Sequence, residues 1–478
     1  MCSKDTCRKI GVFEPSTVFK RRDPMKELRR RFLRIGVFLF IFLFVPANAA
    51  LAGSFLDVAK ETGIEIVQDG DAVLWQGKSG GQTKSQGPLA GKKVAAIVAS
   101  EFSDFQAYYL ASYIGEYGGT LDFLCVDWVT WKFTRPNVKD KGVQGMWGLS
   151  LDPIPVMGPA KHNCKNLGQA KAADYDAVVI LGGHSGDVMV TEAKVMDFIK
   201  AANQKGAVIG GIEAGIMPLI ATRLVEGKKT TGNCVVSYML KKISSFRDTP
   251  MVRDGNLITA RDTVDTPAFV QELCKAFDPA FVDKRRGILA GKRIVMIAGE
   301  DFEDIELVVP AMEFIHRGAQ ITLATFPAPM KSRPALLGLD VVQGNFGCTV
   351  PFQEIPASYY RITKLSEISM NDFDLVMIPG AFCPWNLVVS GRTEWLKQAD
   401  RAGKFIAAIC HAPIPLAAAD LVSGKKIAGW LASKDSVEIM GGKYSSDYAA
   451  VVDGRIVTGR TPPEVPEFLD AITYALLQ

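Results

Sequence analysis

A cysteine and a histidine stand side by side where an apolar stretch of the chain meets a helix-like stretch. Residues 405–409 are small or apolar, as in a buried parallel strand, and residues 413–422 have the pattern of a helix. A thiol at such a turn lies near unpaired helix amides, whose partial positive charge favours the thiolate. A cysteine after an apolar strand is more often only a small buried hydrophobic residue. The two signals described next make Cys410 the best candidate nucleophile, with His411 beside it.

Both further signals also follow apolar strands. The acidic run 300–306 comes directly after residues 294–298, and one of its carboxylates can carry a proton for the Cys410 turn, although most acidic residues in such a run only begin a solvated helix. The sequence Pro379-Gly380-Ala381 follows residues 376–378, and small residues there allow backbone amides to point at a developing oxyanion. Chemistry in parallel sheets gathers at the carboxyl ends of the strands, so we expect the three signals to meet in one site.

The chain contains a long internal repeat. The sequence LAGKK at 89–93 recurs as LAGKR at 289–293, and three further segments recur in the same order, namely 175–183 with 373–381, 224–229 with 421–426, and 254–259 with 453–458. Such a long period indicates two whole domains rather than a solenoid. We predict one domain at 89–278 and a second at 289–478, with the boundary in the charged segment between them.

Short apolar strands alternate with helix-like stretches inside each copy. The strands predicted for the first copy are 94–99, 178–181 and 208–212, and those of the second are 294–298, 376–378 and 405–409. This alternation predicts an α/β fold in which helices cover both faces of a parallel sheet.

Together, these motifs resemble those of the ThiJ/PfpI superfamily, the flavodoxin-like members of the class I glutamine-amidotransferase group. The most specific parts are AICHAP at 408–413 and DIELVVP at 304–310, and DGRIVTGR at 453–460 is similar as well. The resemblance covers both copies, and it implies two flavodoxin-like, doubly wound parallel-sheet domains in tandem.

The resemblance also assigns roles to residues of the second copy. It implies that Cys410 is the nucleophile, that Glu306 is a buried acid beside its sulfur, and that the backbone at Gly380, Ala381 and His411 forms an oxyanion hole. Two positions depart from the usual pattern. Ala381 stands where a second glycine is usual, which narrows the hole while keeping its amide donors, and Ala412 replaces the glycine that usually follows Cys-His.

The first copy departs much further from the pattern. When the copies are aligned on their flanking strands, Glu213 answers Cys410, Ala214 answers His411 and Gln106 answers Glu306. Glu213 can be read as a new acid, but a structural carboxylate near helix amides is the simpler interpretation. We therefore expect residues 89–278 to form a catalytically silent partner domain that packs on the second copy as an internal pseudo-dimer.

The orientation of His411 leads to one hypothesis about the first copy. A histidine that acts as a base needs a partner on its second ring nitrogen. In PfpI-type peptidases, an acid from the adjoining subunit fills this role, four residues after the glycine pair. That position holds Asp187 in the first copy and Trp385 in the second. Asp187 is thus a possible cross-domain orienting residue, although a solvated loop or cap position is its simpler interpretation.

The N-terminal residues have the pattern of an export signal. A basic cluster at 26–34 precedes an apolar run at 35–45, and small residues follow at 47–52. We predict a signal peptide with a long n-region at 1–52 and an exported, periplasmic or extracellular protein, with an uncleaved membrane anchor as the alternative. Residues 53–88 are rich in small and polar residues towards their end, and we interpret them as a flexible linker without chemistry.

Composition narrows the functional classes. Of the formal charge of +4, the first 34 residues contribute +7, so the rest is mildly acidic and does not suggest nucleic-acid binding. Nine cysteines and four histidines show no zinc-ligand spacing, so we expect no metal and no cofactor.

Three functions remain open. The first is a cofactor-independent glyoxalase III or deglycase that acts on reactive dicarbonyls through Cys410 and Glu306. The second is a PfpI-type cysteine peptidase or amidase with His411 as its base. The third is a redox or stress-response protein without enzymatic activity, since an activated cysteine beside a carboxylate also fits a sensor.

Overall fold

The computed structural model describes residues 51–77, 86–126, 143–147, 163–328 and 341–478. The first copy is built on a seven-stranded sheet that is parallel except at one edge, where β10 pairs antiparallel with β11. In spatial order the strands are β10 (Met251–Asp254), β11 (Leu257–Ala260), β7 (Val208–Ile212), β6 (Ala177–Ile180), β3 (Lys93–Val98), β4 (Thr120–Cys125) and β5 (Asn163–Asn166).

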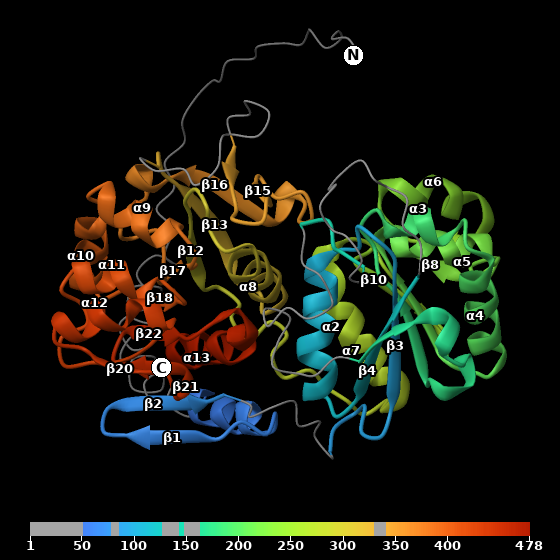
Figure 1. Ribbon diagram of the computed structural model, residues 1–478, viewed down its shortest axis with the longest axis horizontal. Helices are drawn as coiled ribbons and strands as arrows, with labels where there is room; N and C mark the ends of the chain where they lie inside the picture. Colours follow the sequence, from blue (N-terminus) through green and yellow to red (C-terminus); the bar gives the residue numbers. More distant parts are fainter. Residues whose placement is uncertain (1–50, 78–85, 127–142, 148–162, 329–340) are drawn as a thin grey trace, which may run out of the picture. The chain divides into compact units, whose positions relative to one another are not determined.

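The second copy repeats this order strand for strand. Its strands run β21 (Tyr448–Asp453), β22 (Ile456–Gly459), β18 (Phe405–Ile409), β17 (Leu375–Ile378), β12 (Arg293–Ala298), β13 (Gln320–Thr325) and β16 (Tyr360–Lys364). The core strands of both sheets are almost wholly buried, as their continuous apolar runs predict. The predicted α/β fold with two parallel-sheet domains in tandem is confirmed (Figure 1).

Helices connect the parallel strands in each copy. Those of the first copy are α2 (Asp104–Glu116), α3 (Ser185–Met189), α4 (Ala193–Gln204), α5 (Met217–Ala221), α6 (Cys234–Ile243) and α7 (Thr266–Phe277). Those of the second are α8 (Asp304–His316), α9 (Cys383–Val389), α10 (Thr393–Arg401), α11 (Pro413–Ala418), α12 (Lys434–Ile439) and α13 (Val465–Leu477). Three strand pairs lie outside the main sheets: β8 (Lys229–Thr230) with β9 (Ser245–Phe246), β14 (Val342–Gln343) with β15 (Thr349–Val350), and β19 (Lys426–Ala428) with β20 (Lys443–Ser445).

The predicted linker at 53–88 is wrong for its first half. Residues 51–60 are helical, and β1 (Ile66–Asp69) and β2 (Ala72–Gln76) form a hairpin that joins the second copy's sheet, where β2 pairs antiparallel with the edge strand β21 (Figure 1). Trp75 of this hairpin is fully buried, with its ring 5.7 Å from that of Tyr474 in α13. The hairpin pairs with the edge strand β21, so the sheet has nine strands and the edge of β21 is covered.

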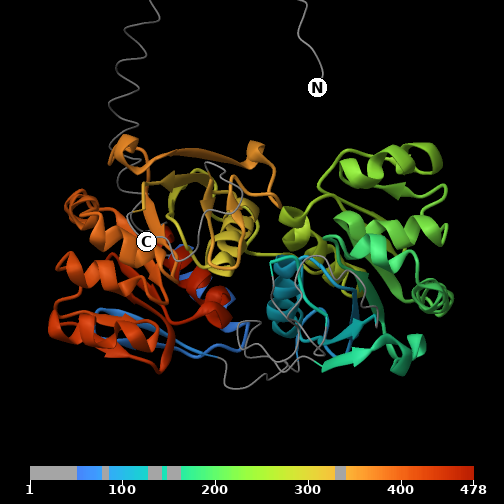
Figure 2. The same cartoon turned by 45° about the horizontal axis from the view of Figure 1, so that its top comes forward.

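The two copies contact each other through α2 and α7 of the first and α8 of the second (Figure 2). The Tyr109 hydroxyl on α2 donates a hydrogen bond of 2.6 Å to Glu313 Oε1 on α8. Glu313 also accepts a bond of 2.8 Å from Arg317 Nε, and Arg317 is completely buried and pairs with Asp470 at 2.9 Å. A buried charge needs such partners, so this network fixes how the helices pack.

The predicted signal peptide lies almost entirely outside the described residues. In the part of the chain that the structure does describe, no helix has both the length and the apolar character needed to cross a bilayer.

Candidate active site

Cys410 lies where β18 ends, in a strained turn. Its φ angle is +63°, a left-handed conformation that residues with a side chain rarely adopt. Two hydrogen bonds hold the turn, one from the Cys410 N–H to the Gly459 carbonyl (3.0 Å) and one from the Trp430 N–H to the Cys410 carbonyl (2.8 Å). The side chain is buried, with 6% of the residue exposed. The predicted nucleophile turn is therefore present, held by two neighbouring segments.

Glu306 reaches the same place from the first turn of α8. Its Oε2 accepts a hydrogen bond of 2.7 Å from the Gly380 N–H, and its own N–H donates 2.7 Å to Oε2 of Glu303, the cap of α8. A Cβ on Gly380 would lie 2.6 Å from Glu306 Oε2 and 2.6 Å from Cys410 Cβ. Position 380 must therefore be glycine, because the carboxylate and the thiol side chain enclose it.

Backbone amides converge on the sulfur of Cys410. The N–H groups of Ala381 and His411 form hydrogen bonds with it that lower the pKa of the thiol. Ala381 holds a φ of +56°, and the equivalent Gly183 of the first copy has +75°. The alanine thus keeps the amide in place at the cost of backbone strain of about 1 kcal/mol.

The electrostatics differ from the sequence-based expectation of a thiolate at rest. Burial and the charges of Glu306 and Glu303 raise the pKa of Cys410 well above its usual value, and they outweigh the two amides. Burial also raises the pKa of Glu306 to about 8, although hydrogen bonds from Gly380 and Cys410 act against this. Near neutral pH, both the Cys410 thiol and the Glu306 carboxyl group are protonated. When the pair loses its first proton, the remaining proton is shared between the two groups.

His411 lies beside the sulfur and has no acidic partner among the residues that the structure describes. Its Nδ1 is 3.3 Å from Cys410 Sγ, and its ring centroid is 6.5 Å from that of Trp430. Burial lowers the pKa of His411, so the ring is neutral at pH 7. Among the described residues, no carboxylate bonds to its second ring nitrogen, so the histidine lacks the orienting partner that a base requires.

Asp187, the possible cross-domain orienting residue, shows no contact with His411 in the described part of the chain. Asp187 is exposed on α3 of the first copy, and within the described part of the chain neither side chain forms a hydrogen bond or an ion pair with the other. The copies meet instead at α2, α7 and α8, and α3 packs on η4 (Glu213–Ile216) and α5 of its own copy. The sequence count could not tell which helices form the interface.

The equivalent turn of the first copy is closed by its own side chains. Glu213 has a φ of +56°, close to that of Cys410. Its Oε2 accepts hydrogen bonds from the Gly183 N–H (3.2 Å), Gln106 Nε2 (3.1 Å) and Thr263 Oγ1 (3.3 Å). Gln106 Oε1 in turn accepts a hydrogen bond of 2.7 Å from the Gly182 N–H, just as Glu306 Oε2 accepts one from the Gly380 N–H in the second copy. A carboxylate therefore fills the place of the anion hole, and no thiol is present there.

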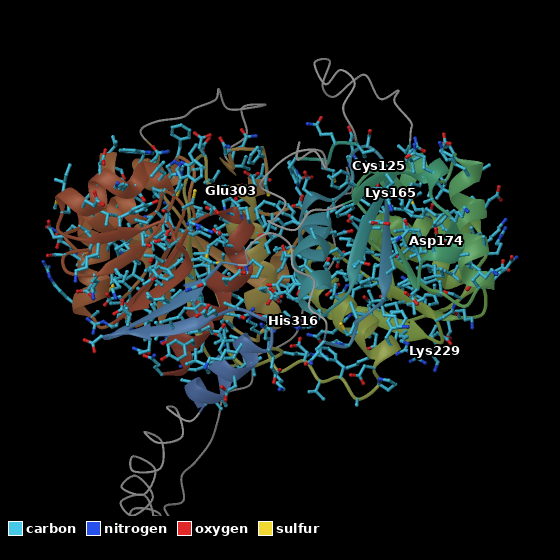
Figure 3. The ribbon with its side chains drawn as sticks, turned by 60° about the horizontal axis from the view of Figure 1, so that its bottom comes forward. Cys125, Lys165, Asp174, Lys229, Glu303 and His316 are labelled. Carbon is cyan, nitrogen blue, oxygen red and sulfur yellow. The ribbon has the colours of Figure 1, made fainter. Side chains whose placement is uncertain are left out.

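Sequence reasoning missed three neighbours of the site. Glu303 lies at the N-terminus of α8, and His316 lies at the other end of this helix (Figure 3). Glu303 stands three residues before Glu306, which is the spacing of a helix cap, but the surrounding acidic residues hid this signal in the sequence. Trp430 reaches the Cys410 turn from twenty residues downstream. Tyr108 of the first copy lies near the two glutamates of the site. Burial raises the pKa of Tyr108, and the charges of Glu467, Glu303 and Glu306 add to this effect.

The described cysteines are spread over both copies. Five of them are free thiols, namely Cys234, Cys274, Cys348, Cys383 and Cys410. Within the described ranges, no three His, Cys, Asp or Glu side chains are grouped so that they could hold a metal ion.

Comparison with known proteins agrees with the motifs. Protein DJ-1 homolog D of Arabidopsis thaliana is 27% identical over 312 residues, which cover 63% of this chain and 78% of that protein. Protein/nucleic acid deglycase 2 of Escherichia coli is 26% identical, covering 37% of this chain and 93% of that protein. A Bacillus subtilis protein named "Putative cysteine protease YraA" is 29% identical, covering 37% and 94%. The model of the DJ-1/PfpI family matches twice, at residues 92–276 and 292–475, so this chain belongs to the DJ-1/PfpI family and carries its domain in two tandem copies.

Proposed function

We propose that the second copy converts small reactive dicarbonyls to hydroxy acids through Cys410, without a cofactor. The observation that carries this proposal is the enclosed Cys410–Glu306 pair, which supplies a nucleophile and a proton carrier to one carbonyl. The lack of an acidic partner on His411 favours this chemistry over a peptidase, since hydrolysis by a cysteine–histidine pair depends on an oriented base.

The reaction begins with attack of the Cys410 sulfur on the aldehyde carbon of a 2-oxoaldehyde. The proton of the thiol passes through Glu306 to the new oxygen, giving a hemithioacetal, while the amides of Ala381 and His411 stabilise the developing negative charge. Glu306 then takes the proton from the former aldehyde carbon and returns a proton to the adjacent carbon. The resulting thioester is hydrolysed by water, so that one dicarbonyl and one water give one hydroxy acid.

Two raised pKa values support this sequence of steps. Glu306, with a pKa of about 8, can both accept and donate a proton near neutral pH. The raised pKa of Cys410 makes its sulfur a good leaving group only when Glu306 protonates it, which couples the two residues in the final hydrolysis. A relative named as a deglycase is consistent with the same class of substrate, that is, carbonyl compounds and their adducts.

A peptidase or amidase function is the second candidate, and the Bacillus subtilis relative named as a cysteine protease favours it. It requires His411 to act as the base with no partner beyond Cys410. Two earlier predictions remain part of the proposal: the protein is exported by its N-terminal segment, and the silent first copy is retained as the internal partner of the second.

A substrate panel on the purified full chain tests the function. Methylglyoxal, glyoxal and phenylglyoxal are offered beside fluorogenic peptides, with detection of the hydroxy acid. Turnover of the dicarbonyls that is lost in Cys410→Ala supports the proposal. Peptide hydrolysis without dicarbonyl turnover assigns the peptidase function, and oxidation of Cys410 to sulfinate without any turnover assigns a sensor.

A further inference from the structure

A cavity of about 570 Å³ lies at the silent turn, between the two copies. Glu213 forms part of its wall, together with α6 and residues 261–263 of the first copy, and residues 352–357 of the second copy close it from the other side. We infer that this cavity binds a small organic cation, such as an ammonium or guanidinium compound, held between Glu213 and Glu354.

The charges of the wall exclude anionic ligands. Four carboxylates and two basic groups line the cavity, a formal charge of −2: Glu213, Asp248, Asp262 and Glu354, with Lys241 and Arg261. Both Asp248 and Asp262 pair with Arg261, at 2.9 and 3.1 Å, which leaves one negative charge in this cluster that the charge of Lys241 formally balances. Lys241 lies on the rim with its ammonium 5.1 Å from the Phe246 ring. The uncompensated charge is therefore that of Glu213 and Glu354.

Neither of these two glutamates has a basic partner within the described part of the chain. Glu213 accepts hydrogen bonds only from neutral groups, and all of them reach Oε2, which leaves Oε1 without one. Glu354 accepts from Trp147 Nε1 and more weakly, at 3.9 Å, from the Cys348 thiol. Two carboxylates on facing walls of one cavity, both lacking a counter-charge, create a site for a cation.

The size and walls of the cavity favour an organic cation over a metal ion. Its volume falls in the range of small-molecule sites. Apolar side chains that are accessible, among them Val235 and Phe246, line part of it and suit the carbon skeleton of an amine. Exposed residues of α6, including Val235 and Lys241, belong to the wall, so the cavity is open to solvent on that side.

Proton linkage gives the inference a second signature. Burial, with the charges of Glu213 and Asp104 as smaller contributions, raises the pKa of Glu354 to about 7, and burial also raises that of Glu213. The other charged groups that face the cavity are Arg261, which is paired with Asp262, and Lys241, which lies over the Phe246 ring. A bound cation favours the ionised carboxylates, so affinity should rise as pH increases through 7 and should fall below it.

Calorimetry on the full chain tests the inference with two matched probes. Arginine amide carries a guanidinium group, and citrulline amide is its neutral isostere. We expect arginine amide to bind to the wild type with an affinity that increases from pH 6 to pH 8, and citrulline amide not to bind. Glu354→Gln should weaken the binding of arginine amide at least tenfold, because the substitution removes the carboxylate charge and keeps the shape of the side chain.

Controls separate this cavity from the Cys410 site. Glu438→Gln removes an exposed carboxylate outside the cavity and should bind like the wild type. The rate of Cys410 alkylation by iodoacetamide should be the same in Glu354→Gln and unaffected by saturating arginine amide. Equal binding of the two probes, an unchanged affinity in both Glu354→Gln and Glu213→Gln, or protection of Cys410 by arginine amide would each overturn the inference. Because no step depends on turnover, failure of the dicarbonyl chemistry leaves this result readable.

Discussion

Glu213 and Cys410 occupy the same strained turn of the two copies, with φ angles of +56° and +63°. The strain has been kept where the thiol has been lost, and the amide that points at sulfur in the second copy donates to a carboxylate in the first. The same backbone turn thus holds the Cys410 thiol in one domain and the Glu213 carboxylate in the other. The two turns share their backbone conformation and differ in their side chains, with Glu213 and Gln106 where the second copy has Cys410 and Glu306.

Loss of the thiol should abolish activity. Cys410→Ser is expected to lower dicarbonyl turnover to background, because a serine hydroxyl does not ionise near neutral pH even with two amides directed at it. The measurement is kcat/KM by product detection. Cys234→Ser removes another free thiol, an exposed one, and should keep the wild-type rate; residual turnover above 1% in Cys410→Ser would contradict the mechanism.

Glu306→Gln should separate alkylation from turnover. The amide cannot carry protons, so kcat should fall by about 10²–10⁴. The alkylation rate of wild-type Cys410 should level off above pH 8, because Glu306, with its pKa of about 8, then shares one proton with the sulfur. In the variant the rate should keep rising with pH, as for an isolated thiol whose pKa is raised. Matching pH profiles in the two proteins would show that the residues do not share a proton.

Relief of backbone strain should stabilise the second copy. Ala381→Gly is expected to raise the free energy of unfolding by about 1 kcal/mol, because glycine adopts the φ of +56° without the contact that Cβ makes there. Urea unfolding measures the change. Ala201→Gly on the exposed face of α4 is a control of opposite sign and should cost about 1 kcal/mol. A loss of stability in Ala381→Gly would refute the strain argument.

Removing one hydroxyl should weaken the contact between the copies. Tyr109→Phe leaves Glu313 without one of its two hydrogen bonds in a buried network, which should cost about 1–3 kcal/mol of unfolding free energy. Tyr238→Phe removes an exposed hydroxyl on α6 and should change stability by less than about 0.5 kcal/mol. Equal midpoints of unfolding for the two variants would show that Tyr109 does not fix the interface.

Apolar side chains beside the site should select the substrate. Phe382, Trp385 and Trp430 are 50%, 37% and 47% exposed, and they adjoin Ala381 and the Cys410 turn. We expect phenylglyoxal to have a higher kcat/KM than methylglyoxal, and Trp430→Ala to lower this preference by about tenfold through lost apolar contact. Met440→Ala on another exposed apolar position is the control. A preference that Trp430→Ala leaves unchanged would assign selectivity elsewhere.

Local sequence patterns were enough to predict the duplicated architecture and the turn that carries Cys410. Repeated segments such as 89–93 and 289–293 and the alternation of apolar strands with helices are local patterns, and the hydrophobic effect converts them into two parallel sheets whatever the rest of the chain does. The meeting of the acidic run 300–306 with the Cys410 turn was also predictable, because both follow strands whose carboxyl ends share one edge, and the resemblance to the family singled out Glu306.

Features that depend on residues far apart in the chain could not be predicted from local patterns. Burial sets the protonation of Cys410 and Glu306, and no local pattern shows how far water is excluded. The polar composition of 53–88 concealed a hairpin that is stabilised by the free edge of β21, some 370 residues away. The places of Asp187 and Glu213 also depend on how the copies pack. With α2 and α7 packed on α8, Asp187 is exposed, whereas Glu213 lines the cavity between the copies. Local sequence encodes the elements, whereas edges, interfaces and exclusion of water arise only when those elements meet.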